Sequence, residues 1–255
     1  MTYIFPPPPV PSVAVRGETA RFPVRRIFCV GRNYEAHARE MGKDPTREAP
    51  FFFTKPADAV VDDGAVVPYP PLTSNFHYEG ELVIAIGKAG FDVGEDEAWD
   101  LIWGYAVGND LTRRDLQFDA RDKGRPWDWG KAFDKSAVCG PICEVMGIGR
   151  REKGAIRLTV NGAVRQEADL SDLIWSVPEI VSILSRSVRL APGDLVYTGT
   201  PAGVGVLVPG DVCVVEIEGL GTLTTTIGER EARPDSSSTT TFARRHRSGC
   251  VPRST

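Results

Sequence analysis

The chain has 255 residues and a net charge of −4, and 42% of its residues are hydrophobic. These values are typical of a globular domain that can bury a sizeable core. Because the acidic balance offers no basic stripe to neutralise a phosphate backbone, we expect no nucleic-acid partner. No stretch approaches the roughly 20 apolar residues of a membrane span, and the start lacks the order of a signal peptide, so we expect a cytoplasmic protein without membrane contact.

The first 26 residues predict an N-terminal arm. Residues 5–11 are rich in proline and favour an extended polyproline conformation, which we expect to lie over the domain. Residues 27–31 have the pattern of a short buried strand. Residues 34–41 then predict a helix with Asn33 as its N-cap and Gly42 as its end.

Short strand patterns dominate beyond residue 50. Residues 82–87 and 104–110 indicate buried strands, and residues 96–102 and 177–185 indicate helices. Asn161-Gly162 predicts a two-residue hairpin, and Pro-Gly turns at 192–193 and 209–210 each lead into an apolar strand. The pattern therefore predicts a mainly β (α+β) domain over residues 27–228, with curved sheets and a few short helices.

The last segment, residues 229–255, changes to Ser, Thr and Arg with almost no apolar residues. Such a composition cannot bury enough apolar surface to offset the entropy of ordering. We expect a disordered tail.

The five cysteines are odd in number and show no paired zinc-ligand spacing. The closest two, Cys139 and Cys143, are separated by a Gly-Pro turn, and no second ligand pair follows them. We expect reduced, mostly buried thiols.

A pair of carboxylates, Glu79 and Glu81, stands at the start of the apolar run 82–87. Side chains two apart in a strand point the same way, so both acids converge on one small volume, where they repel unless a cation joins them. Asp110 ends the strand pattern 104–110 and would deliver a third carboxylate. Three oxygen ligands with open positions suit Mg²⁺ or Mn²⁺. The alternative is three solvated strand ends, and His77, on the same face, suits a softer metal and is expected beside the site.

A second candidate group is His37 with Glu40 on the helix that residues 34–41 predict. Three residues apart, they share one helix face, and the carboxylate can orient the imidazole and raise its basicity. This is the outline of a base that activates water. The alternative is a surface pair that only supports the helix.

Two further segments carry candidate binding groups. Lys131 follows the aromatic cluster 127–129 and is either a substrate-binding cation or a surface residue. Residues 198–205 form a glycine-rich turn that lacks the ending of a phosphate loop. Its backbone amides, such as that of Gly199, and the Thr200 hydroxyl could instead bind a carboxylate.

Together these segments resemble the fumarylacetoacetate hydrolase family over about residues 5–228. The resemblance rests on the order and spacing of residues 29–34 with His37 and Glu40, and of residues 52–56, 77–81, 110–117, 131–134 and 197–205. One departure is Gly80, which stands where relatives commonly carry a larger apolar side chain.

The resemblance implies a mixed β-sandwich roll, a homodimer and a Mg²⁺ or Mn²⁺ site. The implied metal ligands are Glu79, Glu81 and Asp110. His37 and Glu40 are implied to activate water, and the groups implied to bind the 2-oxo acid end of the substrate are Lys131, Gln117, Gly199 and Thr200. The far carboxylate of the substrate needs a cation, for which Arg32, Arg113, Arg114 and Arg125 are candidates that the sequence does not rank.

The implied activity is hydrolysis of a carbon-carbon bond in a small 2,4-dioxo acid (an acylpyruvate). Within the family the resemblance favours fumarylpyruvate, cleaved to fumarate and pyruvate in gentisate-type aromatic degradation. One alternative is decarboxylation or isomerisation of a related 2-oxo diacid on the same metal site. Another is a metal-dependent binding protein without catalysis.

Overall fold

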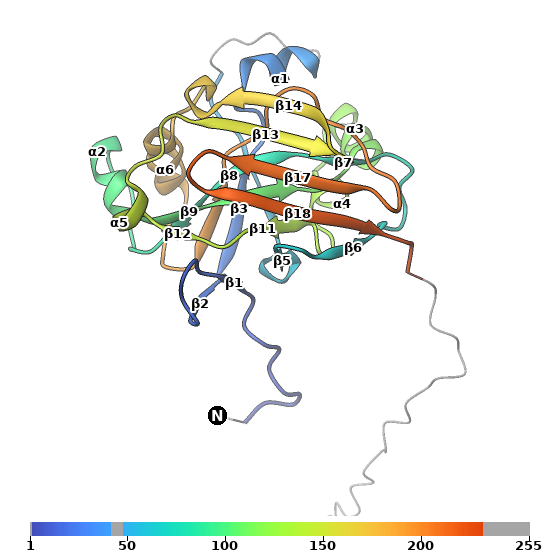
Figure 1. The fold of residues 1–255 in the computed structure, drawn as a ribbon. Helices are drawn as coiled ribbons and strands as arrows, with labels where there is room; N and C mark the ends of the chain where they lie inside the picture. The colour runs from blue at the N-terminus through green and yellow to red at the C-terminus, as the bar shows by residue number, and fades with distance from the viewer. Residues whose placement is uncertain (1, 42–47, 232–255) are drawn as a thin grey trace, which may run out of the picture.

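The computed structural model describes residues 2–41 and 48–231. In this part of the chain the strands form two larger sheets and two small ones (Figure 1). The larger sheet has the order β4 (Phe52–Lys55), β3 (Arg26–Val30), β15 (Asp194–Tyr197), β8 (Gly80–Ile86), β9 (Ile102–Asp110), β11 (Ala137–Cys139) and β5 (Val60–Asp62), with β12 (Cys143–Glu144) also paired to β9. The second sheet has the order β14 (Ala163–Asp169), β13 (Ala155–Val160), β17 (Val212–Ile217), β18 (Gly221–Gly228) and β6 (Val66–Pro68).

The remaining elements are short. The small sheets are β10 (Thr112–Arg113), β7 (Phe76–Tyr78) and β16 (Gly205–Val206), and the hairpin of β1 (Ser12–Ala14) and β2 (Arg21–Pro23). The α-helices are α1 (Glu35–Glu40), α2 (Glu95–Ala98), α3 (Arg114–Asp122), α4 (Asp128–Lys131), α5 (Val145–Ile148) and α6 (Val177–Ser187). Single 3₁₀ turns occur at η1 (Ala57–Ala59), η2 (Trp99–Leu101) and η3 (Leu170–Asp172). The prediction of a mainly β fold with a few short helices is confirmed.

The pattern of buried residues shows that the larger sheet lies in the interior of the molecule. Every residue of β8 is buried, which is why its sequence is a continuous apolar run rather than an alternating one. Strands β13 and β18 alternate buried and exposed residues, because only one face of the second sheet packs on the first. Leu82 and Ile84 of β8 share the core between the two sheets with Leu158 and Val215.

The opposite face of the larger sheet forms a second, smaller core with the β1–β2 hairpin. Val13 and Phe22 of the hairpin pack with Val83 and other small side chains of the sheet. Phe22 also stacks on Trp103, with 5.3 Å between ring centroids. Glu79 and Glu81 alternate with the residues that face the second sheet, so their carboxylates lie on this opposite face.

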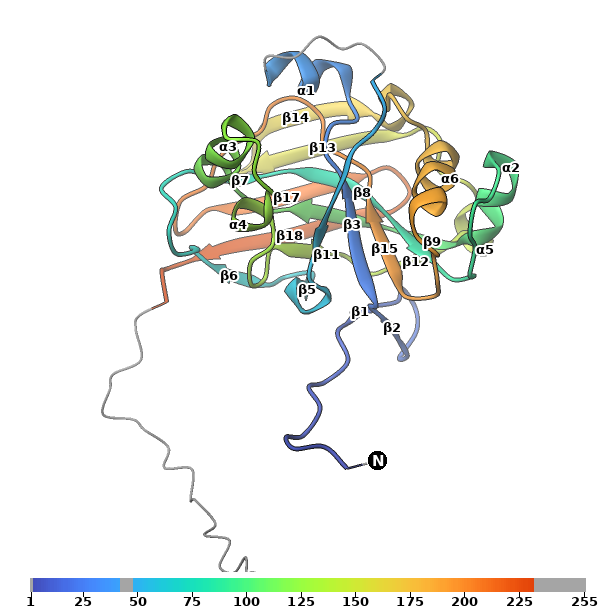
Figure 2. The ribbon, with the colours of Figure 1, turned by 180° about the vertical axis from the view of Figure 1, so that it is seen from behind.

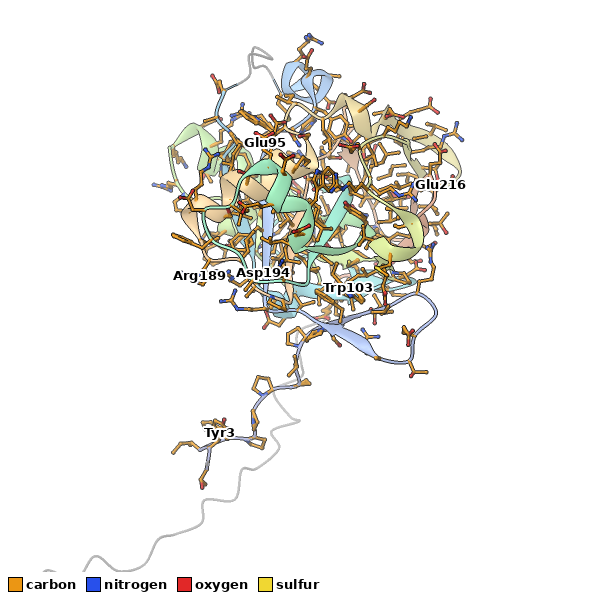
Figure 3. The ribbon with its side chains drawn as sticks, turned by 90° about the vertical axis from the view of Figure 1, so that its left-hand side faces the viewer. Tyr3, Glu95, Trp103, Arg189, Asp194 and Glu216 are labelled. Carbon is orange, nitrogen blue, oxygen red and sulfur yellow. The ribbon has the colours of Figure 1, made fainter. Side chains whose placement is uncertain are left out.

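The predicted arm of residues 1–26 consists of two parts. Residues 2–10 are exposed and run away from the body of the molecule, as the position of Tyr3 shows (Figure 3), whereas we expected them to lie over it. From residue 12 onward the chain forms the packed hairpin. At the other end, Arg230 donates to the Pro70 carbonyl (3.0 Å), so residues 229–231 contact the domain, and residues 232–255 of the expected tail lie outside the described residues.

Most of the predicted elements are present. The helix expected over 96–102 is α2 followed by η2, and α6 begins at Val177 with Pro178 in its first turn. Asn161 and Gly162 form the predicted hairpin between β13 and β14, with φ of 51° and 79°. Cys29, Cys139, Cys143 and Cys213 are free and buried in the described chain, as expected, and Cys250 lies outside it. No helix among the described residues is long and apolar enough to cross a membrane.

A buried carboxylate joins the parallel strands β3 and β15. Asp194, labelled in Figure 3, has a fully buried side chain and lies 3.0 Å from Arg25 and 2.8 Å from Arg26. It also accepts the backbone N–H of Ala191 at 3.0 Å. Charge-assisted hydrogen bonds to a buried acid are stronger than those at the surface.

Asp194→Asn should therefore lower the free energy of unfolding by about 1–3 kcal/mol, because the neutral amide loses both charged contacts. Urea denaturation monitored by far-UV circular dichroism measures this value. The matched control is Glu167→Gln, which removes the exposed pair with Arg157 (3.1 Å). It should change stability by less than about 0.5 kcal/mol, and equal effects of the two substitutions would contradict the argument.

Candidate metal centre and catalytic site

Three buried carboxylates meet at one end of the larger sheet. Glu79 immediately precedes β8, Glu81 is its second residue, and Asp110 is the last residue of β9. The pairing of Gly80 with Asn109 holds the two strand ends side by side. One oxygen from each acid lies within 4.8 Å of the others, so the structure brings together the three acids singled out by the sequence.

Three buried cations from other elements surround these acids. Lys131 of α4 places its Nζ 2.6 Å from Glu79 Oε2 and 2.8 Å from Asp110 Oδ2. Lys55 of β4 lies 2.7 Å from Asp110 Oδ1. Arg114, the first residue of α3, forms an ion pair with Glu79 Oε1. Burying charges is costly unless they are paired, and here each cation has a carboxylate partner.

The surroundings shift the pKa values of Glu79 and Glu81 in opposite directions. Burial raises the pKa of Glu79, but the positive charges of Lys131 and Arg114 outweigh burial and hold that pKa below its usual range. Burial also raises the pKa of Glu81, and here the negative charges of Asp110 and Glu79 add to burial, so the pKa lies well above its usual range. Among the described residues the lysines and the arginine of the cluster pair with Asp110 and Glu79 and not with Glu81, so a further cation beside Glu81 would lower its pKa.

The residues present fit a hard divalent ion. Their donors are carboxylate oxygens, which Mg²⁺ and Mn²⁺ prefer over nitrogen or sulfur. Asp110 Oδ1 is buried and accepts no well-aligned hydrogen bond from the described residues, although Lys55 lies close to it. Glu79, Glu81 and Asp110 are the residues that could hold the ion.

The candidate base, His37, belongs to helix α1. This helix lies at the top of the molecule in Figures 1 and 2. His37 is 3% exposed, and its Nδ1 lies 3.1 Å from Glu40 Oε2, as the spacing of three predicted. Burial raises the pKa of Glu40, but the hydrogen bonds from His37 and from the Gly203 amide outweigh it, so the net shift is downward and Glu40 remains a carboxylate.

The predicted N-cap of this helix is wrong. Tyr34 is the N-cap residue, and the predicted end at Gly42 lies outside the described residues. Asn33 does not cap because its side chain binds two distant segments. It donates to the carbonyls of Trp175 and Thr198, both at 2.9 Å, and accepts the Trp175 amide at 2.7 Å. Asn33 therefore anchors the start of α1 to the loop after β15.

That loop, residues 198–203, connects the two halves of the site. The Gly199 amide donates to Glu81 Oε2 at 2.8 Å, and the Gly203 amide donates to the Glu40 carboxylate at 3.1 Å. Gly199 has a φ of +100°, and a side chain there would meet Asn33, so glycine is required. The amides thus bind carboxylates of the protein itself, one in the acid cluster and one beside the candidate base.

The backbone of Gly80 takes part in a hydrogen-bond network that the sequence did not reveal, and close packing, not this network, accounts for the missing side chain. Its amide donates to Gln166 Oε1 (3.0 Å), and its carbonyl accepts from Thr200 Oγ1 (3.0 Å). Gln166 Nε2 in turn donates to Thr200 Oγ1 (2.8 Å). A Cβ atom at position 80 would lie 3.0 Å from Val215, so the tight packing of the second sheet leaves no free space there. The Thr200 hydroxyl, a predicted substrate contact, already donates within this network.

The other predicted groups surround the cluster. Gln117 of α3 accepts a hydrogen bond from Arg114 through Oε1, which leaves its amide NH₂ as the donor. Arg32 lines a separate aromatic pocket. His77 contacts Asn75 (2.7 Å), and burial together with Arg114 lowers its pKa to about 4, so it is neutral beside the site.

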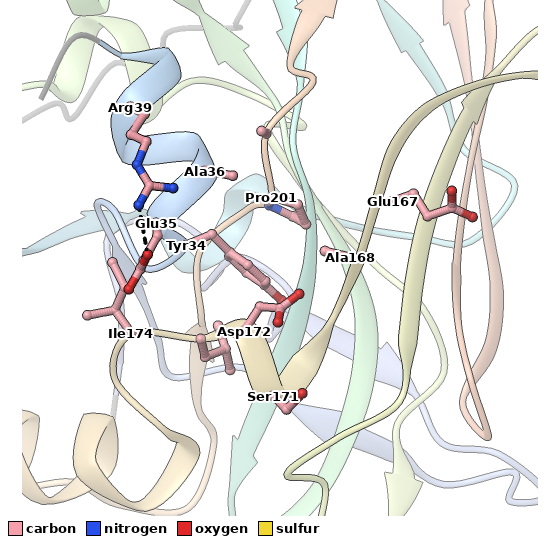
Figure 4. Close-up of a pocket in the computed structure, with 12 residues that line it drawn as sticks. Tyr34, Glu35, Ala36, Arg39, Glu167, Ala168, Ser171, Asp172, Ile174 and Pro201 are labelled. Atoms are coloured by element: carbon pink, nitrogen blue, oxygen red, sulfur yellow. Dashed lines mark hydrogen bonds and ion pairs between the residues drawn. The ribbon is translucent and has the colours of Figure 1, made fainter. Parts of the chain in front are cut away.

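A cavity of about 610 Å³ lies between α1 and the segment from β14 to η3 (Figure 4). Acidic side chains such as Glu35 and Asp172 line it, together with Arg39 and Tyr34. His37 and Glu40 do not line it, nor do the clustered acids. This cavity is therefore distinct from the candidate catalytic centre.

Comparison with known proteins gives the family. The model of the fumarylacetoacetate (FAA) hydrolase C-terminal domain matches residues 26–228. The chain therefore belongs to the fumarylacetoacetate hydrolase family, and the resemblance seen in the sequence is confirmed.

Two members of the family with high sequence identity to this chain are fumarylpyruvate hydrolases. The chain is 52% identical over 188 residues to the fumarylpyruvate hydrolase of Ralstonia sp, covering 74% of this chain and 97% of the relative. A crystal structure of fumarylpyruvate hydrolase from Pseudomonas aeruginosa in complex with Mn²⁺ and pyruvate is 52% identical, with a TM-score of 0.88 over 90% of this chain and all of that one. The fold prediction of the family type is thereby confirmed.

More distant relatives have other activities. The human mitochondrial oxaloacetate tautomerase FAHD1 is 38% identical over 200 residues, covering 78% of this chain and 90% of the relative. The structure of 5-carboxymethyl-2-hydroxymuconate delta-isomerase from Mycobacterium smegmatis is 35% identical, with a TM-score of 0.74 over 84% of this chain and 82% of that one. The scaffold therefore carries both hydrolases and enzymes that shift a double bond or a proton.

Loss of an outer hydrogen-bond partner of a metal ligand typically weakens metal binding by about 10–100-fold. Loss of a charged ligand itself should weaken Mn²⁺ binding by more than this, as tested by Glu79→Gln, Glu81→Gln and Asp110→Asn. Each change removes a charged oxygen from the cluster. Isothermal titration calorimetry with MnCl₂ measures the affinity. Glu35→Gln, on the exposed side of α1, is the matched control and should bind as the wild type does. Unchanged affinity in all three variants would place the metal elsewhere.

Proposed function

We propose that this protein is a metal-dependent hydrolase that cleaves the carbon-carbon bond of a 2,4-dioxo acid, with fumarylpyruvate as its substrate. The observation that carries the proposal is the shared loop at residues 198–203. Its amides hold both Glu81 of the acid cluster (2.8 Å) and Glu40 of the base pair (3.1 Å). This hydrolysis needs a cation-binding group and a base, and the one loop contacts both. The 52% identity to fumarylpyruvate hydrolase supports the choice of substrate.

The reaction adds water to the C4 carbonyl of the substrate. His37 accepts the proton of that water, while Glu40 holds the imidazole in place through Nδ1 and stabilises its charge once it is protonated. The C3–C4 bond then breaks, and its electron pair leaves with C3 as a pyruvate enolate. Protonation of C3 gives pyruvate, and the acyl half leaves as fumarate.

The negative charge that develops on the 2-oxo acid end needs stabilisation. A divalent ion bound by Glu79, Glu81 and Asp110 would supply a Lewis acid there. Lys131 contributes a positive charge at the same place, because the carboxylates of Asp110 and Glu79 outweigh burial and raise its pKa. We further propose that Gln117 offers its amide NH₂ to the 2-oxo acid and that the Gly199–Thr200 segment lines its binding site, with the Gly199 amide held by Glu81 and the Thr200 hydroxyl by the Gly80 carbonyl.

Three further proposals concern the metal ion, the oligomeric state and the cellular location of the protein. We propose Mg²⁺ as the physiological ion with Mn²⁺ as a substitute, supported by the carboxylate donors and by the Mn²⁺ in the Pseudomonas relative. The homodimer is proposed from the family resemblance. The cytoplasmic location is supported by the free thiols of the described cysteines, which are typical of a reducing compartment.

A second candidate function is tautomerisation, isomerisation or decarboxylation of a related 2-oxo diacid. The 38% identity to the human oxaloacetate tautomerase favours keeping it. In these reactions, too, the enzyme must stabilise an enolate, but no water is added to a carbonyl. The presence of both the acid cluster and the His37–Glu40 pair argues against a third candidate, a binding protein without catalysis.

With MgCl₂ or MnCl₂, the wild-type protein should release pyruvate from fumarylpyruvate, and chelation by EDTA should stop the reaction. Loss of the conjugated enol absorbance together with a coupled pyruvate assay measures both events. Turnover also excludes the binding protein without catalysis. Absence of pyruvate at any metal concentration would reject the proposed substrate.

His37→Ala should lower kcat for fumarylpyruvate by about 10²–10⁴-fold, because general base catalysis contributes on that order. Steady-state pyruvate formation measures the effect, and Mn²⁺ affinity measured by calorimetry should remain within about twofold of wild type. Glu35→Gln on the same helix should leave kcat unchanged. Wild-type hydrolysis by the His37→Ala variant would favour a reaction that needs no activated water.

A further inference from the structure

A pocket of about 520 Å³ lies between β4 and the start of α4, lined by Arg32, Phe51, Phe53, Trp127 and Asp128 among others. We propose that this pocket binds the acyl half of the substrate and that Arg32 pairs with its distal carboxylate. The inference rests on the proposed hydrolase function and adds the residues that would select a flat, unsaturated acyl group ending in a carboxylate.

Strand β4 leads from the acid cluster to this pocket. Side chains two apart along a strand share a face, so Phe53 lies on the same face as Lys55. Lys55 Nζ is 2.7 Å from Asp110 Oδ1, and the Phe53 ring centroid is 4.9 Å from Lys131 Nζ. Phe51 continues this row. An acyl chain that extends along β4 from the acid cluster therefore passes Phe53 and enters the aromatic pocket.

The walls of the pocket suit a flat group. Trp127 meets Phe51 edge-on at 5.1 Å between centroids and Phe53 at 5.7 Å. The Phe51 ring lies where a side chain of residue 31 would stand, since a Cβ on Gly31 would be only 1.9 Å from the ring. Aromatic faces and edges favour contact with planar conjugated groups over bulky saturated ones.

Arg32 is the cation of this pocket. Its Cζ lies 5.2 Å from the Phe51 ring centroid, and it forms no ion pair with any carboxylate of the described residues. The other arginines considered from the sequence are placed differently. Arg114 is paired with the acid cluster, Arg113 stacks on an aromatic ring outside the pocket (4.5 Å), and Arg125 is exposed and does not line the pocket. The structure therefore ranks Arg32 first for the distal carboxylate.

The test compares two substrates that share the pyruvate half. Fumarylpyruvate has a distal carboxylate and acetylpyruvate has none. Arg32→Met should lower kcat/KM for fumarylpyruvate by about 10–100-fold, mainly through KM, because a hydrogen-bonded charge pair is lost. It should change kcat/KM for acetylpyruvate by less than about threefold, a difference that a general structural defect would not produce. Arg32→Lys should recover part of the loss, and Arg125→Met, the matched control, should affect neither substrate.

Equal losses on both substrates, or no loss with Arg32→Met, would overturn the inference while the hydrolase function stands. A wild-type protein that cleaves acetylpyruvate but not fumarylpyruvate would also overturn it. If the wild type cleaves neither, the proposed function fails, and calorimetry with fumarate and Mn²⁺ then tests the pocket directly. Fumarate binding that Arg32→Met abolishes would support the pocket, and absence of fumarate binding would reject it.

Discussion

The site depends on the close approach of three buried carboxylates, Glu79, Glu81 and Asp110, with one oxygen of each within 4.8 Å of the others. Like charges at this distance repel strongly in a medium of low polarity, so the arrangement needs positive charge from elsewhere. Lys55 of β4, Lys131 of α4 and Arg114 of α3 provide it. The need for charge balance therefore ties the end of β4 and the helices α3 and α4 to the acid cluster at the end of β8 and β9.

The need to stabilise negative charge also explains why backbone amides donate to carboxylates around the site. The loop of residues 198–203 binds a carboxylate near each of its ends and is itself held by Asn33 and by the Gln166–Thr200 contact. Several anchors restrain this loop, which links the candidate base to the acid cluster. Catalysis by positioned groups requires such restraint.

Much of the site could be predicted because its key spacings are local. Alternation along a strand placed Glu79 and Glu81 on one face, and a spacing of three on a helix paired His37 with Glu40. Long-range contacts leave no such pattern. Lys55 reaches Asp110 across 55 residues, and Gln166 reaches Gly80 across 86. The only local signal for Lys55 was its place at the end of an aromatic strand.

In the fold, too, the features set by local sequence were predictable and those set by long-range contacts were not. Continuous apolar runs marked the central strands and Pro-Gly turns marked strand starts, because burial and turn chemistry act locally. Asn33 was misassigned as a helix cap because its binding partners, Trp175 and Thr198, lie far along the chain. The packed β1–β2 hairpin was also missed, since its three-residue strands are too short to show alternation.

Anomalous X-ray diffraction from crystals of the protein soaked in MnCl₂ would locate the metal ion. We expect a strong manganese peak among the carboxylates of Glu79, Glu81 and Asp110, with His37 facing it and no direct bond from His77. A manganese peak bound by other residues, or none at this cluster at saturating Mn²⁺, would show that these three acids are not the metal site.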